Sequence, residues 1–289
     1  PGSYYLGANV NASAGRHGIE IAASNVTIDL NGFALIGLGN TGIGDGITTE
    51  GARSQITIRN GSIFDFDSDG INLVTGGAGT GAIIENVIVA SCGATGIVVA
   101  ENSIIRSCTS RGNTGAGFSA GDFVVIENCA ASFNQANGYF VGEAAKITNC
   151  TAASSSLIGF FTGVGATISG CSSQNNTSHG FRTGDNTSFA NCSARANGGT
   201  GITGGNRSTV TNTTASSNNS TGISIGVAGV VSDCTATENG FHGIVVTTGG
   251  SVTGSSAYMN TTNGISASGG VVVNACSATS NGRHGISLG

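Results

Sequence analysis

The chain has 289 residues, of which 50 are glycine and one is proline, and only 9% are charged. A net charge of −5 without a basic stripe argues against a nucleic-acid partner, and no apolar run is long enough for membrane insertion. Glycine at this level without a collagen period is typical of a chain that turns every few residues.

Residues 1–17 precede the first regularly placed glycine. We expect Tyr4, Tyr5 and Leu6 to form an N-terminal cap strand for the repeats that follow. An end repeat without such a cap exposes core side chains and unpaired strand edges.

Residues 18–95 contain three long intervals between regularly placed glycines. The intervals are 28 residues from Gly18 to Gly46, 24 from Gly46 to Gly70 and 26 from Gly70 to Gly96. Short alternating strands remain legible inside them. We therefore expect longer, irregular coils whose extra residues lie in loops at the bends.

From residue 96 to residue 289 the chain repeats with a fixed period of 21 residues. An aliphatic or aromatic residue follows each regular glycine, and such a period indicates a repeat architecture. The glycines are Gly96, Gly117, Gly138, Gly159, Gly180, Gly201, Gly222, Gly243, Gly264 and Gly285.

Two polar columns run in step with the glycines. Twelve residues after each glycine stand Cys108, Cys129, Cys150, Cys171, Cys192, Thr213, Cys234, Ser255 and Cys276. Four residues before the next glycine stand Asn113, Asn134, Ser155, Asn176, Asn197, Asn218, Asn239, Asn260 and Asn281. If each repeat is one coil, equivalent residues stack about 4.8 Å apart, and buried asparagines form a ladder of amide hydrogen bonds.

These patterns predict an all-β fold. Each repeat has room for three short strands and three bends but not for a helical hairpin. The prediction is a parallel β-helix of roughly 12 coils, with the whole chain, residues 1–289, as one domain.

The motif N-C-x-A-x-x-N-x-x-x-G-I, seen at residues 191–202, resembles the right-handed parallel β-helix repeat of pectate-lyase-like proteins. Residues 1–6 and 25–33 resemble the first coils of bacterial β-helix surface proteins. The resemblance covers nearly the whole chain and implies an extracellular or cell-surface location. It leaves function open, because the family includes lyases, hydrolases, epimerases and adhesins.

We expect the cysteines of the repeat to be reduced, buried and inert. Neighbours in register would hold their Cβ atoms about 4.8 Å apart, wider than the roughly 3.8 Å that a disulfide prefers. Cys92 differs from the others, because it occupies the asparagine column.

A candidate glycan site lies on the first strand of the middle repeats. The second residue after each glycine points outward; it is small in most repeats but becomes Phe140, Phe161 and Arg182 in the middle. Two exposed aromatic rings one coil apart would offer a platform for a sugar ring. The alternative is that they are isolated exposed apolar residues.

Carboxylates follow the same strand at the next bend. They are Glu101, Asp122, Glu143 and Asp185, with Val164 interrupting the column. Stacked carboxylates repel one another and could recruit a cation such as calcium. The alternative is a solvated bend whose charges keep the protein soluble. We assign Asp122, Glu143 and Asp185 to the glycan site with the two aromatic residues and Arg182.

An enzyme acting on acidic polysaccharides is the competing function. Carboxyls on adjacent coils would lie near the roughly 5–5.5 Å separation of retaining glycosidases. However, the aspartate set of polygalacturonases does not occur, and Lys146 is the only lysine, whereas calcium-dependent pectate lyases use an arginine-and-lysine set. We therefore favour a non-catalytic structural or adhesive role.

The segment D-F-D-S-D-G suggests a calcium loop. Asp65, Asp67 and Asp69 are its candidate ligands, although Gly76 replaces the glutamate that would close the loop. No other cofactor is expected.

Two further columns have structural interpretations. Arg59, Glu85, Arg106 and Glu127 alternate in sign one coil apart, which predicts a ladder of salt bridges. All four histidines directly precede a column glycine, and we interpret this as a turn preference.

The repeat does not fade at the C-terminal end. Asn281, Gly285 and Ile286 are fully in pattern, and the chain stops at Gly289. An uncapped coil is a template for strand addition. We expect either that the natural chain continues or that this end stacks head-to-tail on another copy, which would build a filament.

Overall fold

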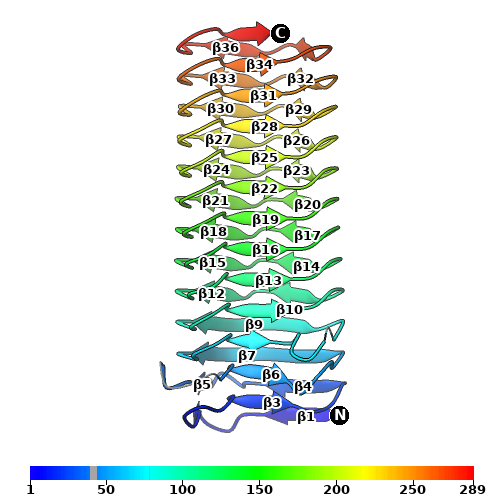
Figure 1. Ribbon diagram of the computed structural model, residues 1–289, viewed down its shortest axis with the longest axis vertical. Coiled ribbons are helices and arrows are strands. Elements are labelled where there is room, and N and C mark those ends of the chain that lie inside the picture. The colour runs from blue at the N-terminus through cyan, green and yellow to red at the C-terminus, as the bar shows by residue number, and fades with distance from the viewer. Residues whose placement is uncertain (40–43, 78) are drawn as a thin grey trace. The chain divides into compact units, whose positions relative to one another are not determined.

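The computed structural model describes residues 1–39, 44–77 and 79–289. The chain divides into two compact units, residues 1–145 (unit 1) and residues 146–289 (unit 2). In the described residues of each unit, the chain winds into coils of short parallel strands, with no α-helix (Figure 1). Each regular coil has a first strand after the regular glycine, then a second and a third strand separated by a tight corner; in two coils of unit 1 the second and third strands form one continuous strand.

Unit 1 has six first strands among its described residues. They are β3 (Ile19–Ile21), β6 (Ile47–Thr49), β8 (Ile71–Asn72), β10 (Ile97–Val99), β13 (Phe118–Ala120) and β16 (Tyr139–Val141). The remaining strands are β1 (Gly2–Tyr5), β2 (Val10–Asn11), β4 (Val26–Asp29), β5 (Ala34–Ile36), β7 (Ile56–Phe64), β9 (Ile83–Ala90), β11 (Ile104–Arg106), β12 (Thr109–Arg111), β14 (Val125–Glu127) and β15 (Ala130–Ser132).

Unit 2, described in full, has seven first strands. They are β19 (Phe160–Thr162), β22 (Phe181–Thr183), β25 (Ile202–Gly204), β28 (Ile223–Ile225), β31 (Ile244–Val246), β34 (Ile265–Ala267) and β37 (Ile286–Leu288). Its second strands are β17 (Lys146–Thr148), β20 (Thr167–Ser169), β23 (Ser188–Ala190), β26 (Thr209–Thr211), β29 (Val230–Ser232), β32 (Ser251–Thr253) and β35 (Val272–Asn274). Its third strands are β18 (Thr151–Ala153), β21 (Ser172–Gln174), β24 (Ser193–Arg195), β27 (Thr214–Ser216), β30 (Thr235–Thr237), β33 (Ser256–Tyr258) and β36 (Ser277–Thr279).

The predicted register is confirmed inside each unit. Strand β10 pairs in parallel with β13 so that Ile97 lies beside Phe118, and β19 pairs with β22 so that Phe160 lies beside Phe181. The described residues contain thirteen first strands, close to the roughly 12 coils predicted from the spacing. The last of these strands, β37, is not followed by a second or third strand among the described residues. The single-domain prediction for residues 1–289 stays a prediction.

The inward aromatic residues stack as the repeat requires. The rings of Phe160 and Phe181 lie 4.8 Å apart and nearly parallel, and Phe118 and Tyr139 repeat this geometry in unit 1. All four side chains are fully buried. An aromatic side chain directly above another in register fills the same space in each coil, so a 21-residue period builds a continuous core.

The predicted asparagine ladder is present in both units. In unit 2, the Asn197 side-chain NH₂ and backbone N–H both donate to Oδ1 of Asn218, at 3.0 and 3.1 Å. Asn218 in turn donates to Asn239 and to the carbonyl of Ala194. Each buried amide is therefore satisfied by the coil above and the coil below, which avoids the cost of a buried unpaired polar group.

The cysteine column is a polar ladder as well as a stack of small buried side chains. All eight cysteines are free, and all except Cys276 are buried. The sulfur of Cys129 lies 3.4 Å from the backbone nitrogen of Cys108, and the Thr213 hydroxyl accepts the Cys192 N–H in the same way. This shared role explains why threonine and serine replace cysteine in the column. Cys92 belongs to the asparagine column, as predicted, because its N–H donates to Oδ1 of Asn113.

The two ends of the described chain differ from the regular coils. Tyr4 and Tyr5 form a strand as predicted, β1, which lies parallel to β4 and extends that sheet, but Leu6 lies just beyond its end. At the other end, Val272, Ile286 and Leu288 have exposed apolar side chains. Chain continuation or head-to-tail stacking at this end stays a prediction.

Candidate functional site

The first face of unit 1 carries the candidate site. Val98, Ser119 and Phe140 are the outward residues of β10, β13 and β16, and they lie in one row because these strands pair in register. The Phe140 side chain is 48% exposed, which confirms its predicted outward orientation. The inward neighbours of Phe140 on the strand, Tyr139 and Val141, are buried.

A groove of about 390 Å³ lies beside this row. Its floor includes Val98 and Ser119, and the carboxylate residues Glu101 and Asp122 line it from two neighbouring coils. Val74, from the loop that follows β8, lines it as well. Apolar floor residues with a few converging polar groups are typical of ligand sites, and the volume falls within the usual range.

Hydrogen bonds hold Val74 and its neighbours in place at the site. The extra residues of this coil leave the first face after β8, and the Thr75 hydroxyl bonds to the buried Thr48 hydroxyl at 3.0 Å. The Asn72 side chain accepts the Val74 N–H at 3.1 Å and donates to Asp69 at 2.8 Å. These bonds tie Thr75 to the preceding coil and hold Val74 at the groove.

Asp122 holds the bend at the groove edge. Its Oδ1 accepts the backbone N–H of Glu143, one coil further along, at 2.7 Å. In unit 2 the same column shows the same contact, because Oδ1 of Asn206 accepts the Val227 N–H at 2.9 Å. The column of acidic and amide side chains therefore caps backbone groups, a structural role that sequence reasoning did not identify.

Phe123 is the site residue that sequence reasoning missed. It directly follows Asp122, is 60% exposed, and has φ of 55°. A left-handed conformation is unfavourable for a bulky residue, and other repeats place asparagine, alanine, glycine or Arg207 at this position. The departure of Phe123 from this column was the available signal.

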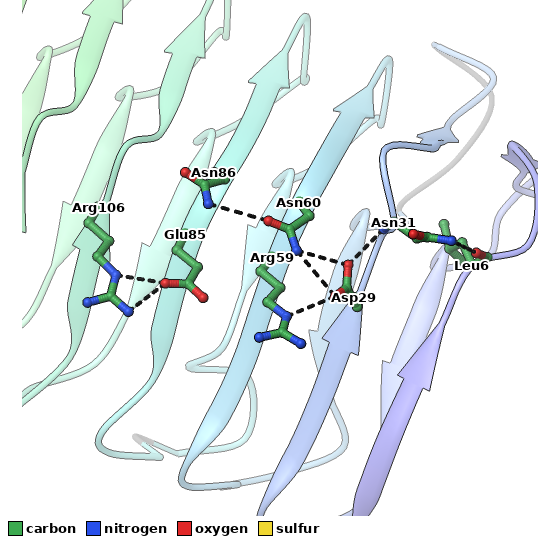
Figure 2. A network of polar contacts seen from close by, with 8 residues as sticks. All are labelled: Leu6, Asp29, Asn31, Arg59, Asn60, Glu85, Asn86 and Arg106. Atoms are coloured by element: carbon green, nitrogen blue, oxygen red, sulfur yellow. Dashed lines mark hydrogen bonds and ion pairs between the residues drawn. The ribbon is translucent and has the colours of Figure 1, made fainter.

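A network of salt bridges and amide hydrogen bonds in unit 1 lies outside this groove. Figure 2 shows a network in which Arg59 pairs with Asp29 at 2.9 Å and Arg106 pairs with Glu85 at 2.6 Å. The Arg106–Glu85 pair confirms one step of the predicted charge column, whereas Arg59 pairs with Asp29, which the prediction did not include. Asn60 and Asn86 extend the network, and Asn60 also donates to Asp29.

The carboxylates that line the groove are not paired with an arginine among the described residues. In the network, the Asn31 backbone N–H, together with Asn60 and Arg59, lowers the pKa of the Asp29 carboxyl. Among the described residues, no such cation lines the groove, and the Glu101 and Asp122 carboxylates have no ion-pair partner.

Unit 2 contains the remaining residues predicted for the glycan site. Phe161 is half-buried and Arg182 is exposed, on adjacent strands β19 and β22. Asp185 accepts the Asn206 N–H at 2.8 Å and lies 3.7 Å from the Arg207 guanidinium. Its charge is therefore partly balanced within the protein, unlike the charges of Glu101 and Asp122.

The structure brings together two of the three predicted calcium ligands. Asp65 and Asp67 line a second cavity of about 400 Å³, with the buried Phe66 between them in sequence. Asp69 instead accepts the Thr95 N–H at 2.7 Å and the Asn72 amide. Burial and the nearby Asp45 raise the pKa of Asp69. Within the described parts of the chain, no three His, Cys, Asp or Glu side chains are grouped to hold a metal.

The coils, ladders and register define a right-handed parallel β-helix protein, as the repeat predicted. Residues 118–261 match the family model described as "Right handed beta helix region". No curated protein sequence matches the chain.

Several solved structures share the fold at low identity. The A-module of the Azotobacter vinelandii mannuronan C-5 epimerase AlgE6 is 14% identical, with a TM-score of 0.51 over 93% of this chain and 91% of that one. A mutant of the periplasmic alginate epimerase AlgG is 13% identical, with a TM-score of 0.56 over 94% and 78%. The Dettilon tailspike protein is 11% identical, with a TM-score of 0.54 over 99% of this chain and 61% of its own.

A search for a membrane-crossing helix was negative: the described residues contain none of sufficient length and apolarity.

Proposed function

We propose that this chain is a glycan-binding β-helix protein, located outside the cell or at its surface, that binds a saccharide chain along the first face of unit 1 without converting it chemically. The carrying observation is the groove lined by Val98, Ser119 and two carboxylates. Two exposed aromatic residues adjoin this lining: Phe140 lies beside Ser119 on the next strand, and Phe123 directly follows Asp122 in the chain. Aromatic rings provide flat apolar surfaces for sugar rings, and carboxylates accept hydrogen bonds from hydroxyl groups.

The comparisons support this proposal at the level of the fold. Two of the similar structures are named as epimerases of mannuronan and of alginate, which are polysaccharides, and a third is a tailspike. One name includes the word periplasmic, in keeping with a location outside the cytoplasm. The identities, 11–14%, are too low to transfer an activity, so the site itself carries the proposal.

A polysaccharide-active enzyme is the second candidate. Glu101 and Asp122 line one groove from adjacent coils. The coil spacing of about 4.8 Å is close to the roughly 5–5.5 Å that separates the carboxyls of retaining glycosidases. Asp122 already accepts a backbone hydrogen bond, which favours a positioning role over proton transfer.

The test is a glycan array probed with the wild type, Phe123→Ala, Phe140→Ala and the control Phe133→Ala. Phe133 is 68% exposed in the same unit but follows a third strand, β15. Both groove variants should weaken binding about tenfold or more while Phe133→Ala does not, since stacking contacts contribute on the order of 1–2 kcal/mol. Equal binding by all four proteins would refute the proposed site. If the protein cleaves or epimerises a bound glycan and Glu101→Gln abolishes that reaction, the site is catalytic and the second candidate function is correct.

A further inference from the structure

The charges around the groove specify a class of glycan. Glu101 and Asp122 line it from neighbouring coils, and its lining includes neither lysine nor arginine. Glu143 follows in the same column and is also exposed. The groove therefore presents a row of negative charge at a spacing of about 4.8 Å.

The described residues do not balance this charge. Two carboxylates elsewhere in unit 1, Asp29 and Glu85, are each paired with an arginine from the following coil. The Asp122 carboxylate instead accepts one backbone N–H, from Glu143, and Glu101 has no side-chain partner in the described part of the chain. A ligand that carries positive charge would supply the missing counterion without rearranging the protein.

We propose that the groove selects a glycan with free amino groups, such as a glucosamine polymer, over uronic acid polymers. This inference rests on the proposed function. Ammonium groups of the ligand would lie against Glu101 and Asp122, and its rings against Phe123 and Phe140. A uronate chain brings a carboxylate with every residue, and like charges placed together in a partly enclosed groove repel.

The apolar part of the site fits the same ligand. Val74 and Val98 line the groove beside the carboxylates, and Phe140 continues the row of outward residues. A sugar ring has an apolar face that can lie on these side chains while its amino substituent reaches the acidic edge. The bond between Thr75 and Thr48 fixes the segment that carries Val74, so this apolar side of the groove is held in place.

The experiment measures binding of three oligosaccharides of equal length to the full chain by calorimetry, at about pH 6 and low salt, where screening is weak. They are a glucosamine oligomer, its N-acetylated form and a galacturonate oligomer. The glucosamine oligomer should bind most tightly, and its affinity should fall as salt is added. Binding of the galacturonate oligomer at equal or higher affinity, with or without calcium, would overturn the inference.

Charge-removing variants localise the effect. Glu101→Gln with Asp122→Asn should weaken glucosamine-oligomer binding roughly tenfold, since exposed ion pairs contribute modestly. The amide oxygen that Asp122→Asn introduces can still cap Glu143, as Asn206 caps Val227, so the fold is retained. The control, Asp233→Asn with Glu238→Gln, removes the same two exposed charges from corners in unit 2 and should leave affinity unchanged.

The outcomes separate the two proposals. If all glycans bind with equal affinity and only the phenylalanine variants matter, the proposed function holds and the charge inference fails. If no glycan responds to Phe123→Ala or Phe140→Ala, the glycan site itself is wrong. An equal loss of binding in the charge variant and its control would also overturn the inference, because the effect would then be net charge alone.

Discussion

The carboxylate of Asp122 caps the backbone of Glu143: its Oδ1 accepts the Glu143 N–H at 2.7 Å, one coil further along the chain. Asn206 makes the equivalent contact to Val227 with an uncharged oxygen. The cap therefore needs an oxygen at this position but not a negative charge. The charge of Asp122 is available for another purpose, and its place at the groove suggests a ligand.

The first prediction separates these two properties of Asp122. Asp122→Asn should melt within about a degree of wild type, because the amide oxygen can still accept the Glu143 N–H. Asp122→Ala leaves that N–H without its partner, and we expect a loss of about 1 kcal/mol, seen as a fall in Tm of roughly 2–4 °C. Circular dichroism melts measure both. Equal destabilisation by the two substitutions would show that the charge itself stabilises the bend.

The second prediction concerns the asparagine ladder of unit 2. Asn218→Ala removes the acceptor for two Asn197 donors and the donor for Asn239 inside a dry column. Unsatisfied buried groups at this site should cost about 2–4 kcal/mol. The control is Asn219→Ala, at the exposed neighbouring position. Urea unfolding should show a large fall in midpoint for Asn218→Ala alone, and similar midpoints would contradict the ladder's importance.

The third prediction concerns pH and the histidines that precede the column glycines. Nδ1 of His179 accepts the Thr200 N–H at 3.1 Å, and Nδ1 of His242 lies 3.3 Å from the Asn263 nitrogen. Burial, together with nearby Arg182, lowers the pKa of His179; burial and Arg283 lower that of His242. The predicted turn preference therefore has a physical cause in a ring nitrogen that caps the next coil.

These lowered pKa values set the sign of the pH effect. Unfolded histidine takes up a proton near about pH 6.5, and the folded rings do so only at lower pH. The histidines thus contribute their full stability above about pH 6.5, and it is lost as pH falls toward the folded-state pKa values. The double variant His179→Asn with His242→Asn should show a smaller change in the urea midpoint between about pH 7.5 and about pH 5.5 than the wild type does. If the midpoint changes with pH as much in the double variant as in the wild type, the histidines are not the source of the pH dependence.

The sequence was sufficient to predict the coils, because a 21-residue period places the same side chain in the same environment each time. Phe160 inside and Phe140 outside follow from strand alternation alone. The bends were less predictable. Their conformation depends on residues in left-handed geometry, so the exposure of Phe123 and the capping by Asp122 could not be obtained from spacing.

The irregular coils limited the site prediction in a different way. The path of the loop at Val74 depends on contacts with another coil, such as the bond between Thr75 and Thr48. The calcium motif depends on other coils in a similar way, and calcium binding there stays a prediction: Asp65 and Asp67 line one cavity, but Asp69 does not. Phe66 is buried between Asp65 and Asp67, and Asp69 caps Thr95 in the next coil.

A tryptophan reporter tests the central claim, glycan binding on the first face of unit 1. The chain contains no tryptophan, so Phe140→Trp introduces a single fluorescent indole beside the groove, and Phe133→Trp places one at an exposed corner outside it. Titration with the glucosamine oligomer should shift and saturate the emission of Phe140→Trp while leaving Phe133→Trp unchanged. An unresponsive Phe140→Trp protein that still binds the oligomer by calorimetry would contradict the assignment of the site.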